Sequence, residues 1–134
     1  MPVIDTDDKM LRLNGGVWPD IETKNEILLP IVVDTAASMS NVVLFNSYMP
    51  LDRTRNLKAR GLEVVLLEVS DAELRRRDEI RLTEEGWTNR KWFDWHQAMI
   101  QQHRDAGLID HLLDGERDAA SIATDLMSIR RAGP

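Results

Sequence analysis

The sequence predicts an α/β fold in three layers, with a mainly parallel sheet flanked by helices. Short apolar runs rich in β-branched residues alternate along the chain with longer segments whose apolar residues recur at helical spacing. The short runs are apolar on both faces, which is typical of parallel strands covered by helices on each side. Such an alternation of strands and helices favours one layered α/β domain over separate helical and sheet regions.

Four runs are candidates for strands. The clearest are residues 41–45 (NVVLF) and 62–69 (LEVVLLEV), which polar residues bound. Residues 108–115 (LIDHLLDG) form a weaker run, and residues 2–4 (PVI) form a short one. In a parallel sheet, functional side chains gather beyond the carboxyl ends of the strands. Those ends are residues 5–8, 46–48, 70–71 and 114–117.

Helices are predicted between these strands. Residues 20–39 have Pro30 in their middle, which should kink or split a helix because proline lacks a backbone N–H. Another helix should begin at Ser70, which has capping-box spacing to Glu73, and end at Gly86. The remaining predicted helices are residues 50–60, 88–106 and 118–131. The apolar residues expected to line one face of the first segment are Ile21, Ile27, Leu28, Ile31 and Val32.

Composition excludes several classes of protein. The 134 residues suffice for one domain, which we expect to span residues 1–134. The formal net charge of −6 disfavours binding to nucleic acid or to an anionic membrane. No run approaches the roughly 18 apolar residues of a membrane span. The absence of cysteine excludes disulfides and thiolate metal sites, and the acidic start is unlike a signal peptide, so we expect a cytoplasmic protein.

Three carboxylates, those of Asp5, Asp7 and Asp8, follow the first predicted strand. Carboxylates at a strand end can orient a substrate hydroxyl, accept its proton, or hold Mg2+ through water. The same residues suit a polar loop in which Asp5 or Thr6 caps a turn. The residue types favour the loop, whereas the position at a strand end favours a site.

A second candidate site lies in LRRRDEIRL. Arg77 and Arg81 are four residues apart, so both side chains leave the same helical face. Two guanidinium groups on one face can bind a polyphosphate and neutralise the charge that develops during phosphoryl transfer. The alternative is a solvated face whose arginines pair with nearby acids. Those acids are Asp78, Glu79, Glu84 and Glu85.

An aromatic group follows the arginine-rich helix: Trp87, Trp92, Phe93 and Trp95, with His96 beside it. Packing in a core is favoured for this group, and stacking on the base or sugar of a ligand is the alternative. The three histidines show no metal-ligand spacing with carboxylates. No lysine is followed by serine or threonine, so the chain has no G-x-x-x-x-G-K-[ST] phosphate loop.

The order of these segments resembles that of the P-loop small-molecule kinases of the shikimate, gluconate and adenylate kinase type. VIDTDD (residues 3–8) is similar to the acidic segment after that family's second strand, which meets substrate and magnesium. NVVLFNS (41–47) resembles the Walker B strand, with Asn46 where an aspartate or small polar residue is usual. VVLLEVSDAELRRRDEIR (64–81) resembles the strand and lid-entry helix with the pattern L-x-x-R-x-x-x-R. DHLLDGERDAASIATDLM (110–127) resembles the last strand and helix.

The resemblance implies roles for particular residues. Asp5 would orient or deprotonate the acceptor hydroxyl, and Asp7 would assist the metal through water. The lid, about residues 75–95, would bring arginines to the phosphates of ATP, and the loop after the last strand would pass the adenine. The implied catalytic residues are Asp5, Asp7, Arg77 and Arg81. The implied substrate-binding residues are Asp5, Asp7, Asp8 and Asn46, and the implied nucleotide-binding residues are Arg77, Arg81, Gly115 and Arg117.

The family's first strand, phosphate loop and first helix have no counterpart in this sequence. In the family that strand is central, between the strand ending at Asn46 and the one ending at Val69. The remaining strands must therefore close the gap, pair with another chain or leave an edge exposed. We expect the C-terminal portion of an N-terminally truncated P-loop kinase, which would transfer phosphate from ATP to a small-molecule hydroxyl with Mg2+. By itself this portion should be inactive or weak, because the phosphate loop supplies the N–H cradle.

Two other functions stay open. The chain could be a non-catalytic binding or dimerising module on a kinase-derived scaffold, in which case a homodimer is possible and ATP affinity is not expected. It could also be a metal-dependent phosphohydrolase that uses Asp5 and Asp7. For the kinase the expected partner is a small-molecule phosphate acceptor, and neither nucleic acid nor a membrane is expected.

Overall fold

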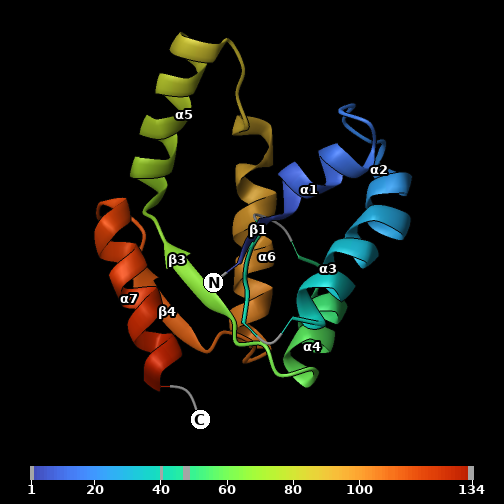
Figure 1. Cartoon of the computed structure of the whole chain (residues 1–134). Helices are drawn as coiled ribbons and strands as arrows, with labels where there is room; N and C mark the ends of the chain where they lie inside the picture. The colour runs from blue at the N-terminus through green and yellow to red at the C-terminus, as the bar shows by residue number, and fades with distance from the viewer. Residues whose placement is uncertain (1, 40, 47–48, 133–134) are drawn as a thin grey trace. The chain divides into compact units, whose positions relative to one another are not determined.

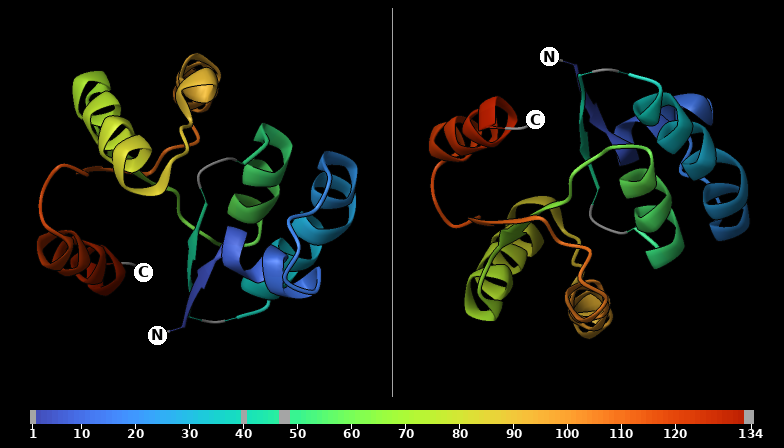
Figure 2. Two further views of the ribbon diagram at one scale, coloured as in Figure 1. Left: turned by 90° about the horizontal axis from the view of Figure 1, so that it is seen from above. Right: turned by 90° about the horizontal axis from the view of Figure 1, so that it is seen from below.

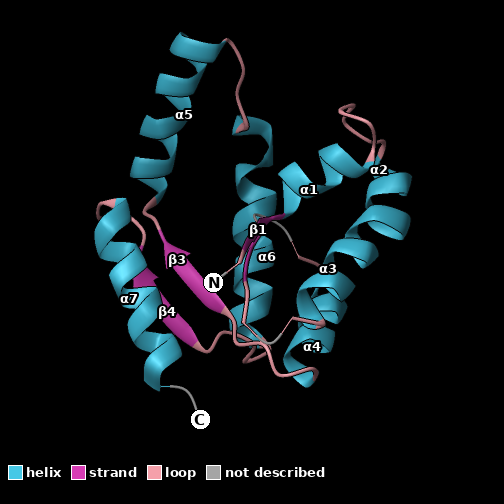
Figure 3. Cartoon of the chain, in the orientation of Figure 1, coloured by secondary structure: helices cyan, strands magenta, loops and turns pink. Residues whose placement is uncertain are grey.

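The computed structural model describes residues 2–39, 41–46 and 49–132 (Figure 1). The α/β class is confirmed, with short strands and longer helices (Figure 3). The chain divides into two compact units, Met1–Leu62 and Glu63–Pro134. Among the described residues the strands form two separate two-stranded parallel sheets, β1 with β2 and β3 with β4. The parallel pairing was predicted, whereas a single larger sheet was expected.

The first unit is built around β1 (Val3–Asp5) and β2 (Val43–Phe45), which pair with Val3 opposite Val43. The Thr6 hydroxyl is buried and donates to the Phe45 carbonyl oxygen over 2.6 Å, which fixes the end of β1 beside the end of β2. Ser47 and Tyr48, predicted to follow this strand end, lie outside the described residues. The helices of this unit are α1 (Thr6–Leu13), α2 (Ile21–Thr23), the π-helix η1 (Lys24–Leu28), α3 (Leu29–Ala37) and α4 (Leu51–Ala59).

Helix α1 was not predicted from the sequence, which favoured an acidic loop at residues 5–8. The helix begins directly after β1 because Asp5 acts as its N-cap, with Oδ1 accepting from the Asp8 N–H over 3.2 Å. Asp7 and Asp8 then lie in the first turn, where carboxylates stabilise a helix through its dipole. A capping role for Asp5 was the alternative considered from the sequence, although for a turn rather than a helix.

The predicted break at Pro30 is confirmed. Pro30 lies in the first turn of α3, and the residues before it form the π-helix η1. Of the predicted apolar face, Leu28 and Val32 are buried. The prediction is wrong for Ile21, Ile27 and Ile31, which are exposed. The buried core of the unit consists of Met10, Leu28, Leu29, Val32, Val33 and Leu57, with α1 packed beside α3 (Figure 2).

The second unit is built around β3 (Val65–Glu68) and β4 (His111–Asp114), which pair with Leu66 opposite Leu112. The predicted caps are confirmed: the Ser70 hydroxyl accepts from the Glu73 N–H, and Gly86 ends the helix with a φ of 78°. Helix α7 packs along β4. The remaining elements are α5 (Asp71–Glu85), the 3-10 helix η2 (Arg90–Trp92), α6 (Phe93–Asp105) and α7 (Ala119–Ala132).

Within the described part of the chain, every helix falls short of the length and apolar character that crossing a membrane would require.

The Thr6 hydroxyl provides a test of the first unit. Thr6→Val keeps the shape of the side chain but removes the hydrogen bond to Phe45, which should lower the free energy of unfolding by about 1 kcal/mol. Thr35→Val is the matched control, because the Thr35 hydroxyl donates to the Ile31 carbonyl within one exposed helical turn. We expect the control to change stability by less than about 0.5 kcal/mol in urea unfolding. Equal effects of the two substitutions would show that the hydrogen bond of Thr6 to Phe45 does not stabilise the unit.

Candidate functional site

The predicted acceptor-side residues lie at the strand ends of the first unit. Asp5, Asp7 and Asp8 are exposed, and Asn46, directly after β2, is half-buried. Asp8 forms an ion pair with Arg12 over 3.0 Å along one side of α1. Capping and helix-dipole effects account for these carboxylates without a ligand, but they leave the side chains accessible to one.

Gly115 closes the ends of the two strands in the second unit. Its N–H donates to the Glu68 carbonyl oxygen over 2.8 Å. A Cβ atom at this position would lie 2.9 Å from Val69 Cγ2 and 3.1 Å from the Glu68 carbonyl oxygen. Only glycine therefore allows the chain after β4 to approach the end of β3 so closely.

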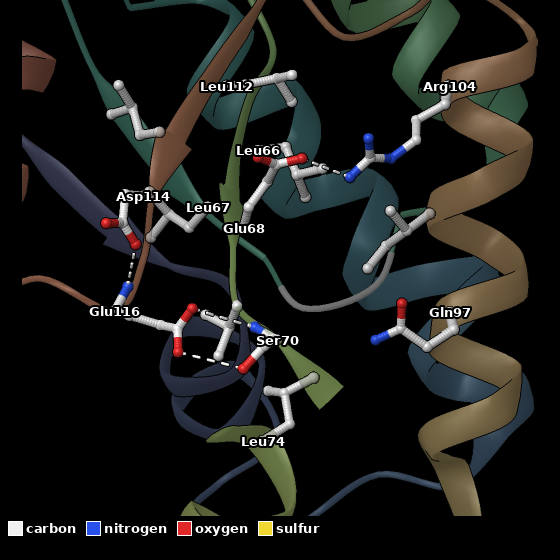
Figure 4. Close-up of a pocket in the computed structure, with 13 residues that line it drawn as sticks. Leu66, Leu67, Glu68, Ser70, Leu74, Gln97, Arg104, Leu112, Asp114 and Glu116 are labelled. Atoms are coloured by element: carbon white, nitrogen blue, oxygen red, sulfur yellow. Dashed lines mark hydrogen bonds and ion pairs between the residues drawn. The ribbon is translucent and has the colours of Figure 1, made fainter. Parts of the chain in front are cut away.

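A second link joins the same two strand ends. The Glu116 carboxylate accepts from the Ser70 hydroxyl over 3.2 Å and from the Ser70 N–H over 3.4 Å (Figure 4). Because Ser70 is also the N-cap of α5, this contact places the start of α5 beside the loop that leads to α7.

Arg77 ties α5 to that loop. Its Nε donates to Glu73 over 3.0 Å, and its Nη2 donates to the Gly115 carbonyl oxygen over 3.3 Å. The structure thus brings together Arg77 and Gly115, which the resemblance assigned to the phosphates and to the adenine loop. Hydrogen bonds from Arg76 and then from Arg77 lower the pKa of Glu73 to about 2.

Arg81 has a different environment, although it shares a helical face with Arg77. Its Nη1 lies 3.5 Å from Asp78 Oδ1, and its guanidinium lies 4.6 Å from the centroid of the Trp87 ring. Its ion pair is thus longer than the 3.0 Å contact of Arg77 with Glu73.

Asp78 is the residue whose importance sequence reasoning missed. Its side chain is only 1% exposed, and it accepts hydrogen bonds from the Thr88 hydroxyl and, over 2.9 Å, from the Asn89 N–H. These two bonds, in that order, lower the pKa of Asp78. Thr88 and Asn89, a pair of polar residues just after the helix stop at Gly86, were the available signal, because they can turn back onto the helix.

Arg117 lies in the loop before α7 and pairs with Asp125 on that helix, which raises the pKa of Arg117. The first turn of α7 is capped by Asp118, which accepts from the Ser121 N–H over 2.8 Å. Arg117 is thus held along α7. Two residues of the loop expected to pass the adenine, Arg117 and Asp118, are therefore bonded to α7.

The tryptophans after α5 are not core residues. Trp87, Trp92 and Trp95 are 48%, 44% and 44% exposed, so the favoured interpretation of core packing is wrong for them. Trp92 and Trp95 pack edge to face with ring centroids 5.9 Å apart. Lys91 lies over Trp92 at 5.4 Å, which repeats the cation–aromatic pairing of Arg81 with Trp87.

A pocket of about 520 Å³ opens beside the β3–β4 sheet, between that sheet and α6 (Figure 4). Its charged lining is mainly acidic, with Glu68, Asp114 and Glu116 against Arg104, which pairs with Glu68 over 2.7 Å. The described residues that line it do not include the arginines predicted to bind phosphates. An acidic lining repels a polyphosphate, so we do not identify this pocket with the nucleotide site.

The described side chains do not by themselves form a metal site. The described residues contain no group of three or more histidines, aspartates or glutamates arranged to hold a metal ion. The role expected for Asp7, which is to assist Mg2+ through water, requires only one carboxylate. Phosphate oxygens and water would supply the other ligands of that ion.

No protein-family model, curated protein or solved structure matches the chain. The site is therefore interpreted from its residues.

The Glu73 carboxylate allows a direct test of the α5 ion pairs. In an NMR titration it should protonate near pH 2, below its ordinary value of 4.5. Because the folded pKa is lowered, its contribution to stability is complete above about pH 4.5 and is lost as the pH falls toward 2. Arg76→Gln should raise the midpoint, whereas Arg75→Gln should not, because Arg75 pairs with Asp71. An unchanged midpoint in Arg76→Gln would disprove the assignment.

Gly115→Ala tests the closure of the strand ends. The added methyl group meets backbone and side-chain atoms, so we expect a loss of about 1–3 kcal/mol in stability. The residue 115 amide should also exchange faster with solvent, because its bond to the Glu68 carbonyl is displaced. Gly107→Ala is the control: Gly107 has a φ of 67° but open space around it, so that variant is strained without disturbing the 115 amide. Unchanged exchange at residue 115 in Gly115→Ala would rule out the close approach.

Proposed function

We propose that this chain is the C-terminal portion of an ATP-dependent small-molecule kinase of the P-loop type, which transfers a phosphoryl group to a hydroxyl. The observation that carries the proposal is the strand pairing. β1 pairs with β2 within the first unit, and β3 pairs with β4 within the second, each in parallel. The proposed kinase sheet would contain the same two parallel pairs, one on each side of its central strand.

In the proposed kinase, Asp5 interacts with the acceptor. A carboxylate offers about four lone-pair sites, so the single N–H that Asp5 caps leaves capacity for a substrate hydroxyl. Asp5 would orient that hydroxyl or accept its proton as it attacks the phosphoryl group. Asp7 and Asp8, one turn into α1, and Asn46 after β2 would complete the acceptor side.

Two arginines of α5, Arg77 and Arg81, would have different roles in binding the nucleotide. Arg81 is the proposed phosphate ligand, because its ion pair with Asp78 is long and its other contact is with the Trp87 ring rather than with a hydrogen-bond acceptor. Arg77 donates to the Gly115 carbonyl oxygen and would link the lid helix to the adenine loop. ATP supplies the transferred phosphoryl group, and Mg2+ would neutralise its oxygens.

The phosphate cradle of such a kinase must come from residues other than those described. A cradle forms where backbone N–H groups point outward at the start of a helix. Gly15 and Gly16 have positive φ angles and follow the end of α1, so they stop a helix rather than start one. The family's phosphate loop would lie before the segment that resembles its second strand.

One observation favours a second candidate, a non-catalytic binding module. Many cations of α5 are already matched by acids of the same helix, as in the pairs Arg75–Asp71 and Arg76–Glu73. A helix whose charges are internally balanced is stable without a ligand. This module would bind no ATP, whether or not further sequence is joined to it.

The kinase proposal predicts a phosphate loop in the adjoining coding region. We expect an in-frame G-x-x-x-x-G-K-[ST] within roughly 40 codons upstream of Met1, since a βαβ unit takes about 30 residues or more. If that region encodes no such motif, the proposal fails.

The longer polypeptide should bind Mg-ATP by calorimetry and phosphorylate a hydroxyl compound, whereas the 134-residue chain should do so weakly or not at all. In the longer polypeptide, Arg81→Gln should slow phosphoryl transfer about 10²-fold, because it removes a charge that stabilises the transition state. Arg75→Gln is the control and should leave the rate unchanged, since Arg75 pairs with Asp71 elsewhere on the helix. Equal rates in the two variants would remove Arg81 from the site.

A further inference from the structure

Arg81 is held by a chain of contacts that begins at a buried carboxylate. Asp78, in the middle of α5, receives its closest hydrogen bonds from neutral donors, the Thr88 hydroxyl and the Asn89 N–H. Both donors lie beyond the end of the helix, so these bonds fold the segment after Gly86 back onto α5. Arg81 and Arg90 also lie 3.5 Å and 3.6 Å from the carboxylate. Burial makes the shorter bonds costly to lose, because water cannot replace them.

The folded-back segment carries Trp87, the residue before Thr88. The Trp87 ring lies 4.6 Å from the Arg81 guanidinium, within the range of a cation–π contact. The direct approach of Arg81 to Asp78 is 3.5 Å, longer than the 2.9 Å bond of Asp78 to Asn89. Asp78 thus orders the segment, and the segment places an aromatic ring against Arg81.

The contact with Trp87 leaves the N–H donors of Arg81 available for an anion. A cation–π contact is made with a ring and not with a hydrogen-bond acceptor, so the N–H donors of the guanidinium are not used up by it. An arginine restrained in this way loses less side-chain freedom when it binds an anion, because part of that freedom is already gone. Arg90, by contrast, is bound to Glu79 through Nη2.

We propose that Asp78 and Trp87 are positioning residues, which hold Arg81 so that its N–H edge meets the phosphates of a polyphosphate ligand. The inference rests on the proposed function for its choice of ligand, because that function makes Arg81 a phosphate ligand. Trp87 acts on Arg81 through its ring, and Asp78 acts through the segment that it anchors and through its own 3.5 Å contact with Arg81.

The test is an NMR titration of the full chain with inorganic tripolyphosphate at low ionic strength, followed through the Arg81 Nε–H signal. In the free protein this signal should be shifted upfield by the Trp87 ring current. Trp87→Leu should remove that shift and weaken binding about two- to fivefold, the range expected for an exposed cation–π contact. Trp87→Phe, which keeps an aromatic face, should restore most of the affinity.

The contribution of Asp78 is tested by the sign of its effect. Asp78→Asn removes a negative charge next to Arg81, which by electrostatics alone should strengthen anion binding. A positioning role predicts weaker binding instead. Thr88→Val changes no charge but removes the hydroxyl bonded to Asp78, so it should weaken binding. Thr83→Val is its control, because the Thr83 hydroxyl donates only to Glu79 one turn earlier.

The outcomes separate this inference from the proposed function. Binding that is weaker in Arg81→Gln and also in Trp87→Leu and Thr88→Val supports the inference, even if the longer polypeptide lacks kinase activity. Arg81-dependent binding that Trp87→Leu and Thr88→Val leave unchanged overturns the inference while Arg81 keeps its phosphate role. Binding of equal strength in the wild type and in Arg81→Gln, followed through backbone amide signals because the variant lacks the Arg81 Nε–H, or no binding by either, overturns the inference. The kinase proposal, which expects weak or no ATP binding by this chain, is tested separately in the longer polypeptide.

Discussion

The close approach of two strand ends at Gly115 is the constraint on which the second unit depends. The Gly115 N–H bonds to the Glu68 carbonyl where a side chain would clash with β3. That contact fixes where α5 can start, because Ser70 caps α5 and binds Glu116 next to Gly115. It also presents the Gly115 carbonyl to Arg77. One glycine without room for a Cβ therefore sets the relation of strand, helix and loop.

The two units differ in how they are stabilised. The first has a compact apolar core, formed by α1, η1, α3 and α4 around residues such as Met10 and Leu29. In the second, Met99 and Leu108 are the buried apolar side chains among the described residues, and each keeps 8% of its surface exposed. Hydrogen bonds and ion pairs form much of the remaining framework. Two-stranded sheets are marginal by themselves in water. β3, which is apolar on both faces, would gain most from a further strand.

Local chemistry made much of this fold predictable. The cap at Ser70, the stop at Gly86 and the break at Pro30 follow from the backbone preferences of single residues. Helix α1 was missed because the acidic residues of its first turn are equally compatible with a polar loop. The inward face of α3 was only half predicted: Leu28 and Val32 are buried as expected, but Ile27 and Ile31 are exposed. The pairs 27/31, 28/32 and 29/33 all have the same four-residue spacing, so spacing alone does not select which of these apolar rows faces inward.

The candidate site was predictable only in part, for a different reason. Spacing places Arg77 and Arg81 on one face of α5, but it does not say what each will meet. Their partners come from residues distant in the chain: Gly115 for Arg77, and Trp87 with the segment that Asp78 anchors for Arg81. Such partners depend on how strands and loops pack, which local propensity does not encode.

Arg77 and Arg81 have different surroundings, so they can have different roles on one helix. Arg77 is held at two atoms, by a carboxylate and by a backbone carbonyl, so moving it to a ligand would break two bonds. Arg81 makes a longer ion pair, over 3.5 Å, and lies over the Trp87 ring. In the proposed kinase, Arg77 would hold the loop after β4 while Arg81 binds a phosphate. Two equally tethered arginines would give rigidity without binding, and two unrestrained ones would lose more side-chain entropy on binding.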